Sequence, residues 1–209
     1  MHKLVRPKEE PSGLAEARSL QCRDWSAFWQ GRSKAKEELQ LALLLMQDEK
    51  CAYCECKLDL HEGHIEHFRR KNVDWFPELT FEWGNLYYSC CRNGTCGRHK
   101  DRVLDKPRVG ELIDPCTDNP EDYLQFTFDG NVAVRSEQSE EGASRATLTI
   151  DTFNLRHTQL VEMRLNTLKS YEWLKQMSAI QIDAYLSQLP STTPFLTAIY
   201  HYFGKRLCE

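Results

Sequence analysis

Two pairs of cysteines form the most distinctive chemical pattern of the sequence. Two residues separate Cys51 from Cys54, and five separate Cys90 from Cys96. Thiolate pairs at such spacings can enclose a zinc ion tetrahedrally, and closing the site can supply folding free energy on the order of 10 kcal/mol. The pairs therefore predict a structural zinc site with these four ligands. Cys56 and Cys91 are spare candidates, and Cys91 could be the fourth ligand in place of Cys96.

A glutamate and a histidine stand side by side shortly after the first cysteine pair, in the segment GHIEHF. This segment is predicted to be the second strand of a hairpin that begins near Lys57. Strand alternation places His64 and Glu66 on one face and His67 on the other, although a twisted strand end can bring neighbouring side chains to one site. A carboxylate can hold a divalent cation against a scissile phosphate while an imidazole takes a proton from water. The pair therefore suits phosphodiester hydrolysis.

An asparagine and a further histidine follow later in the chain. Asn85 does not titrate near neutrality, so its amide is expected to orient the base imidazole or the hairpin backbone through hydrogen bonds. Alternatively, it caps a helix that follows. His99 lies on a short helix expected at 96–100 and offers a second nitrogen ligand that faces Glu66. Together these residues predict a cation held between a strand and a helix.

Basic residues follow both halves of this segment. Arg69, Arg70 and Lys71 come directly after His67, and the second run comprises Arg92, Arg98, Lys100, Arg102, Lys106 and Arg108. Scattered basic residues usually form a solvated face, but these flank the predicted site on both sides. The residues predicted to contact phosphates are Arg69, Arg70, Lys71, Arg98 and Lys100. No base-reading element is evident, so little sequence preference is expected.

The overall composition supplies no general attraction to nucleic acid. The chain has 209 residues, a net charge of -4 and a pI near 6.0. It has no apolar run near the roughly 20 residues that span a membrane, and the N-terminus lacks the apolar core of a signal peptide, so we expect a cytoplasmic protein. In that reducing compartment the nine cysteines favour metal thiolates over disulfides. Cys22, Cys116 and Cys208 lie outside the clusters and are expected to be ordinary thiols.

The first fifty residues are expected to precede the chemical segment as an arm and two helices. Residues 1–13 contain few apolar anchors and predict a loosely packed arm. Trp25, Phe28 and Trp29 indicate an aromatic cluster on a short helix. A leucine-rich core helix is predicted over 34–50, with Ser33 as its cap.

The second half of the chain is expected to change from short strands to helices. Asp129-Gly130 between two alternating segments predicts a hairpin. The segment 139–144 is expected to be an exposed loop. Helical spacing begins at 151, and a final helix is predicted over 194–207.

The motifs CAYCE, GHIEHFRRK, WGNLYYSC and CGRHKD together resemble the HNH endonuclease family, and within it the PtuB-type nucleases of the Septu anti-phage system and their retron-associated relatives. The resemblance covers residues 35–115 and thins to patches beyond them. It implies an α+β fold: an HNH ββα-metal core with a structural four-cysteine zinc, embedded between N- and C-terminal helices. The implied regions are an N-terminal arm and short helix (1–33), the nuclease module with its zinc knuckles (34–110), a short-strand and hairpin region (111–150) and a C-terminal helical region (151–209).

The resemblance also assigns roles to single residues. It makes His67 the general base, Asn85 the central asparagine of the HNH signature and Glu66 a ligand of the catalytic divalent cation, expected to be Mg²⁺. Many HNH proteins place a histidine or asparagine directly after the last cysteine, where this chain has Gly97. The remaining candidates for the second cation ligand are His99 and His64.

The implied function is metal-dependent hydrolysis of nucleic acid, expected to be DNA, by the nuclease effector of a bacterial anti-phage defence complex. The implied partners are a PtuA-like ATPase and, in retrons, a reverse transcriptase with its reverse-transcribed DNA. A rival interpretation is a non-catalytic zinc-binding adaptor subunit that docks on an ATPase, and the glycine after Cys96 favours it. A zinc-ribbon nucleic-acid binder would leave Glu66, His67 and Asn85 unexplained.

Overall fold

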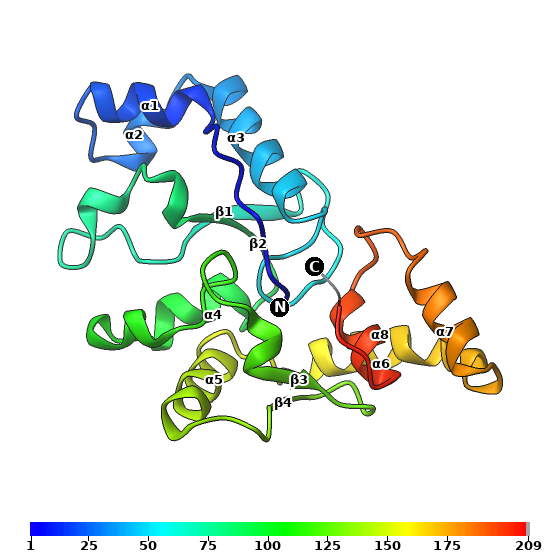
Figure 1. Cartoon of the computed structure of the whole chain (residues 1–209). Coiled ribbons are helices and arrows are strands. Elements are labelled where there is room, and N and C mark those ends of the chain that lie inside the picture. The colour runs from blue at the N-terminus through cyan, green and yellow to red at the C-terminus, as the bar shows by residue number, and fades with distance from the viewer. Residues whose placement is uncertain (208–209) are drawn as a thin grey trace.

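The computed structural model describes residues 1–207, without the side chains of residues 106 and 107. Cys208, predicted to be an ordinary thiol, lies outside the described residues. The fold mixes helices and short strands (Figure 1). The α-helices are α1 (Ser12–Ser19), α2 (Trp25–Trp29), α3 (Ser33–Met46), α4 (Cys96–Val103), α5 (Glu140–Thr152), α6 (Thr158–Lys169), α7 (Ala179–Leu186) and α8 (Leu196–Tyr202). The strands are β1 (Gly63–His67), β2 (Leu86–Cys90), β3 (Leu124–Phe126) and β4 (Val132–Val134). Short 3-10 helices cover Pro77–Leu79, Trp83–Asn85, Lys106–Glu111, Pro120–Asp122 and Glu172–Gln176.

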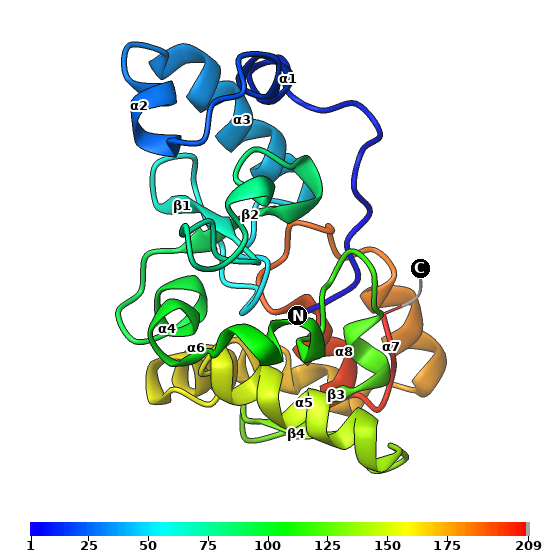
Figure 2. The same ribbon diagram turned by 90° about the vertical axis from the view of Figure 1, so that its left-hand side faces the viewer.

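The elements lie in three tiers that both ribbon views show. Helices α1 to α3 stand at one end, the β1–β2 ribbon lies in the middle, and the remaining elements gather at the other end (Figures 1 and 2). Both α3 and α4 contact β2, so the ribbon is held between the two ends. Among residues 1–207, no helix combines the length and the apolar character that crossing a membrane requires.

The central ribbon pairs strands that the sequence did not pair. β1 runs antiparallel to β2, with Gly63 opposite Cys90 and His67 opposite Leu86. The predicted hairpin with a first strand near Lys57 is therefore wrong, since Lys57 makes only an isolated bridge to Lys50. The physical reason is burial, because every residue of β2 is buried and its backbone needs a partner strand inside the fold.

The core helix α3 is confirmed, but it ends four residues before the predicted Lys50. Just after it, the buried Gln47 side chain bonds to β2: its Oε1 accepts from the Tyr88 backbone N–H at 2.7 Å, and its Nε2 donates to the Tyr88 carbonyl at 2.8 Å. Ser33 is the first helical residue and not the cap, a position that Arg32 occupies. The Gln47 amide thus fastens the helix end to the ribbon.

The N-terminal arm is packed, which corrects the expectation of a loose segment. Met1 and Leu4 are buried, and the Leu4 N–H donates to the Pro115 carbonyl at 2.8 Å. The guanidinium of Arg6 lies over the rings of Trp83 and Tyr87, at 4.9 and 4.7 Å from their centroids. Cation–π contacts of this kind anchor a segment that has few apolar residues of its own.

In the second half, the hairpin and the final helix agree with the prediction, whereas the helices between them begin at other residues than predicted. The hairpin around Asp129 and Gly130 is confirmed as β3–β4, and the final helix is confirmed as the shorter α8. The predicted loop at 139–144 is instead the start of α5. Ser139 caps this helix by accepting from the Gly142 N–H at 3.1 Å, and two glutamates in the first turn suit the positive end of the helix dipole.

Candidate active site and zinc site

The structure brings the four predicted zinc ligands into one buried cluster. Cys51 and Cys54 lie in the turn after α3, Cys90 ends β2 and Cys96 begins α4. Their Sγ atoms all lie within 4.8 Å of one another, with 3.8 Å between Cys51 and Cys96 and 3.9 Å between Cys54 and Cys90. Four sulfurs at a Zn–S distance of about 2.3 Å stand about 3.8 Å apart at the corners of a tetrahedron. The cluster therefore fits a closed metal site such as that of zinc.

The alternative fourth ligand is placed elsewhere. The Sγ of Cys91 lies 3.6 Å from Nδ1 of His64 and does not belong to the four-cysteine cluster. Cys96 reaches the other three sulfurs because it adopts a left-handed backbone conformation, with φ 54°, at the start of α4. Its N–H donates to the Phe153 carbonyl at 2.8 Å, which ties this ligand to the end of α5.

The first cysteine pair is shaped by backbone hydrogen bonds. The Cys51 N–H donates to the Cys56 carbonyl at 2.9 Å, and Glu55, directly after Cys54, has a φ of 63°. The Cys90 N–H donates to the Cys51 sulfur at 3.4 Å. N–H groups directed at sulfur stabilise thiolate charge, so the local fold favours metal binding.

Glu66 lies in a second, charged site. It helps to line a cavity of about 360 Å³ between β1, the loop that follows it and α4. Its Oε2 accepts from His64 Nε2 at 3.2 Å, and its Oε1 lies 2.9 Å from Nζ of Lys100. Burial alone would raise the pKa of the Glu66 carboxyl, but the Lys100 ammonium and the bond from His64 lower that pKa. Glu66 is therefore a buried carboxylate at neutral pH.

His67 lines the same cavity from the end of β1. Its Nε2–H donates to the Thr80 carbonyl at 3.0 Å, and the edge of the Trp25 ring packs on the imidazole at a centroid distance of 4.6 Å. A carbonyl accepts only from an N–H, so the neutral ring keeps its lone pair on Nδ1. Burial, and then the nearby charge of Lys71, lower the pKa of His67 to about 3. The ring is therefore neutral and held in one tautomer.

Asn85 holds the loop that begins directly after His67. Its Nδ2 donates to the carbonyls of Arg69 and Leu79 at 2.9 and 3.1 Å, and its Oδ1 accepts from the Arg69 N–H at 2.7 Å. The backbone bonding corresponds to one of the two orienting contacts that the sequence suggested. The alternative of a helix cap is wrong, because strand β2 follows Asn85.

His99 does not face Glu66. Its Nδ1 bonds to the Thr152 carbonyl of α5 at 2.9 Å. Successive helical residues are rotated by about 100°, so the side of α4 that carries Gly97 and Lys100 toward Glu66 points His99 away. Within the described residues, the four cysteines are the one group of three or more His, Cys, Asp or Glu with ligand atoms close enough for a metal. The structure therefore does not bring His99 to Glu66, and a cation held between them stays a prediction from the sequence.

Lys100 is also placed differently from its prediction as a phosphate contact. Its side chain is fully buried, and Nζ donates to the carbonyl of His67 and to Asp101 Oδ1, besides its contact with Glu66. Sequence reasoning missed this pairing because it took every lysine near the site for a surface charge. The signal was present, since Gly97 and Lys100 share one helix face through their spacing of three.

Three of the other predicted phosphate contacts do line the cavity, namely Arg70, Lys71 and Arg98. Arg70 lies over the Trp75 ring at 4.7 Å and pairs with Asp101 at 3.6 Å. Burial lowers the pKa of Lys71. Arg69 is exposed beside them, and the side chain of Lys106 lies outside the described part of the chain.

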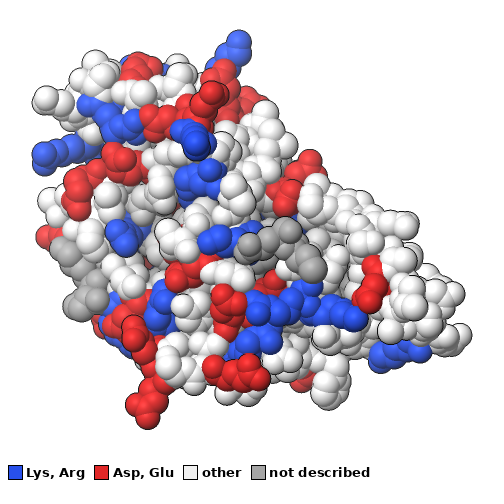
Figure 3. Space-filling model, in the orientation of Figure 1, with Lys and Arg blue, Asp and Glu red and all other residues white. Residues whose placement is uncertain are grey.

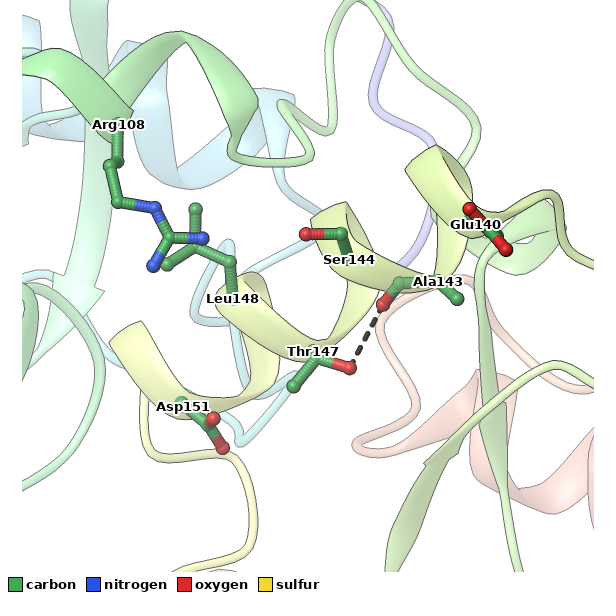
Figure 4. Close-up of a pocket in the computed structure, with 7 residues that line it drawn as sticks. All are labelled: Arg108, Glu140, Ala143, Ser144, Thr147, Leu148 and Asp151. Atoms are coloured by element: carbon green, nitrogen blue, oxygen red, sulfur yellow. Dashed lines mark hydrogen bonds between the residues drawn. The ribbon is translucent and has the colours of Figure 1, made fainter.

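The remaining basic residues are spread over the surface. On the face shown in Figure 3, lysine and arginine side chains alternate with acidic ones. Arg108 lies in a different cavity, of about 470 Å³, along α5 (Figure 4). There the Thr147 hydroxyl bonds back to the Ala143 carbonyl of its own helix at 2.9 Å. Of these two cavities, the one beside Glu66 also contains histidine side chains.

Comparison with known proteins identifies similar chains. "Septu protein PtuB" of Bacillus thuringiensis is 39% identical over 94 residues, which are 44% of this chain and 34% of that protein. "Septu protein PtuB" of Bacillus mycoides (strain KBAB4) is 29% identical over 166 residues, 66% of this chain and 54% of that protein. "Retron Vc95 putative HNH endonuclease" of Vibrio cholerae serotype O1 biovar El Tor is 29% identical over 154 residues, 69% of this chain and 70% of that protein. The chain resembles the PtuB and retron HNH nucleases.

This similarity confirms the resemblance seen in the sequence motifs. No family model matches the chain. The chain spans about a third and about half of the length of the two PtuB relatives. What the structure adds to the similarity is a mixed fold with a buried four-cysteine cluster and, beside it, a cavity that contains Glu66 and His67.

Proposed function

We propose that the cavity beside β1 hydrolyses phosphodiester bonds of nucleic acid, with DNA as the substrate, and that β1, β2 and α4 are the ββα core of an HNH nuclease module within residues 34–110. The observation that carries the proposal is the state of His67. Its ring is neutral, is fixed by the Thr80 carbonyl through Nε2, and lines a basic cavity. A neutral imidazole in that position can take a proton from an attacking water.

The basic residues of the cavity are the proposed phosphate-binding groups. Arg70, Lys71 and Arg98 surround the base with positive charge, which can hold a phosphate and stabilise the charge that develops on it. Asn85 keeps the loop that carries two of them at a fixed distance from His67. Because the net charge of the chain is -4, the attraction for nucleic acid must come from this local positive charge.

The two implied metals differ in how well the residues fit them. The four cysteines fit structural zinc, and they would hold the ends of β2 and α4 together. The predicted Mg²⁺ ligands do not fit, because His99 faces α5 and the Lys100 ammonium lies against Glu66. We therefore derive no catalytic step through a divalent ion.

The names of the relatives support a biological role. We propose that the chain is the nuclease effector of a bacterial anti-phage complex of the Septu or retron type and acts in the cytoplasm. The proposed partners are a PtuA-like ATPase and, in a retron, a reverse transcriptase with its DNA. A protein named "Septu protein PtuA" is 25% identical to this chain over 210 residues, and its name supports the Septu context.

A second candidate is a zinc-binding adaptor that docks on the ATPase without cutting. Gly97 and Lys100 favour it, because the first supplies no cation ligand and the second lies where a cation would bind Glu66. This candidate leaves the fixed tautomer of His67 without a purpose. Nuclease activity distinguishes the two.

The deciding experiment is cleavage of duplex DNA by the zinc-loaded chain and its His67→Ala variant, each with the partner ATPase present. We expect the variant to keep its zinc and its fold but to lose cleavage by about 10²- to 10⁴-fold, the usual contribution of a general base. His61→Ala is the matched control, since His61 is exposed in a turn, and should cleave like the wild type. Cleavage that survives in His67→Ala would remove the proposed base, and a wild type that never cleaves would favour the adaptor.

A further inference from the structure

Lys100 has the contacts of a bound cation. Its Nζ lies 2.9 Å from Glu66 Oε1, 2.7 Å from Asp101 Oδ1 and 3.0 Å from the carbonyl oxygen of His67. An ammonium has three N–H groups, and three oxygens from β1 and α4 surround this one. The side chain is fully buried, so water does not share in these contacts.

The helix reaches Glu66 only because residue 97 has no side chain. A Cβ at Gly97 would lie 2.4 Å from the Glu66 carboxylate. Any ligand side chain at this position would therefore displace Glu66 or α4. This close approach brings the first turn of α4 against β1. Lys100, about one turn later on the same helix face, then reaches the Glu66 carboxylate.

We propose that the Lys100 ammonium is the resident cation of this site and occupies the place of a divalent ion between Glu66 and Asp101. The inference deepens the proposed function by naming the cation of that cavity, and it depends on that function for its catalytic meaning. Lys100 is a positioning residue, because its three contacts are with the protein. It balances the charge of Glu66 and fixes the carbonyl of His67, the residue that carries the proposed base.

Divalent-ion binding tests the inference without any measurement of cleavage. The zinc-loaded full chain and its Lys100→Met variant are titrated with Mn²⁺, and bound Mn²⁺ is counted by electron paramagnetic resonance. The wild type should bind no Mn²⁺ that depends on Glu66. Lys100→Met should gain one Mn²⁺ per chain, bound more than about 100-fold more tightly than by the wild type. The reason is that the variant lacks the ammonium whose positive charge repels Mn²⁺ from the carboxylates. The double variant Lys100→Met/Glu66→Gln should lose this ion again.

The matched control is Arg102→Met, which removes one positive charge from an exposed position of the same helix and should gain no ion. Mn²⁺ bound by the wild type and lost in Glu66→Gln would overturn the inference, as would a zinc-loaded Lys100→Met that gains none. If Lys100→Met loses its zinc, Mn²⁺ binding by the wild type is compared with that by Glu66→Gln. Mn²⁺ that the wild type binds and Glu66→Gln does not would overturn the inference, and equal binding by the two would support it. His67→Ala should leave every titration unchanged, so failure of the hydrolytic proposal is seen separately.

Discussion

The four-cysteine cluster and the Glu66 cavity both include residues of the β1–β2 ribbon, but they treat their metal-binding residues differently. In the cluster, four buried sulfurs lie close enough together to enclose an ion. In the cavity, a buried carboxylate already has a cation within the protein, and an imidazole remains neutral. The comparison teaches that metal-binding residue types indicate a metal only where their ligand atoms converge and no side chain of the protein already takes the place of the cation.

The largest expected effect breaks the cluster. Cys51→Ser should lose zinc and unfold the β1–β2 ribbon, since closing such a site contributes apparent free energy on the order of 10 kcal/mol. Zinc content and thermal unfolding measure this. Cys91→Ser, whose sulfur lies at His64 instead, should keep both. A Cys51→Ser protein that is folded and melts like the wild type would show that the cluster does not hold the scaffold.

Acid should next affect two buried histidines, His67 at the cavity and His2, whose Nδ1 lies 3.8 Å from Glu55 Oε2. Burial lowers the pKa of His67 to about 3 and that of His2 to about 4, from an ordinary value of 6.5. Because the unfolded chain binds these protons first, the stability is fully present above about pH 6.5 and falls as the pH decreases toward the folded values. At pH 5 each histidine should cost about 2 kcal/mol.

Chemical denaturation between pH 7.5 and pH 4.5 measures this loss, and His67→Gln should make the dependence shallower by about half. A His67→Gln protein with the same pH dependence as the wild type would contradict the neutral, buried state of the ring.

A smaller effect is expected from a methyl group at the contact between α4 and β1. Gly97→Ala places a Cβ 2.4 Å from the Glu66 carboxylate, so either the helix or Glu66 must move. Overpacking of this kind costs typically about 1–3 kcal/mol. Urea unfolding of Gly97→Ala against Gly84→Ala, where a Cβ meets nothing within 4 Å, measures the difference. Equal stabilities would show that the close approach is not needed.

The sequence predicted the parts of this arrangement that depend on local spacing. It identified the four cysteines, the helix at α3 and the hairpin at Asp129-Gly130 because each signal lies within a few neighbouring residues. It missed the pairing of β1 with β2, because neither strand contains a local signal that identifies its partner strand across the intervening loop.

The candidate site was predicted in the same uneven way. Glu66 and His67 were found as neighbours, and the structure places both at one cavity. The Trp25 ring and the Thr80 carbonyl that hold the imidazole come from other parts of the chain and carry no chemical signature. The sequence placed His99 at Glu66, where the structure has Lys100, because the direction of α4 relative to β1 depends on Gly97, a residue with no side chain to suggest a contact.

The most direct test of the account is the rate of DNA cleavage by the zinc-loaded wild type, with its partner, after a chelator has removed free divalent ions while the thiolate-bound zinc remains. The account assigns structure to the zinc and chemistry to His67 with the basic side chains around it, so it predicts a rate close to that without chelator. Cleavage that stops on chelation with zinc retained, and returns when Mg²⁺ is added back, would contradict it.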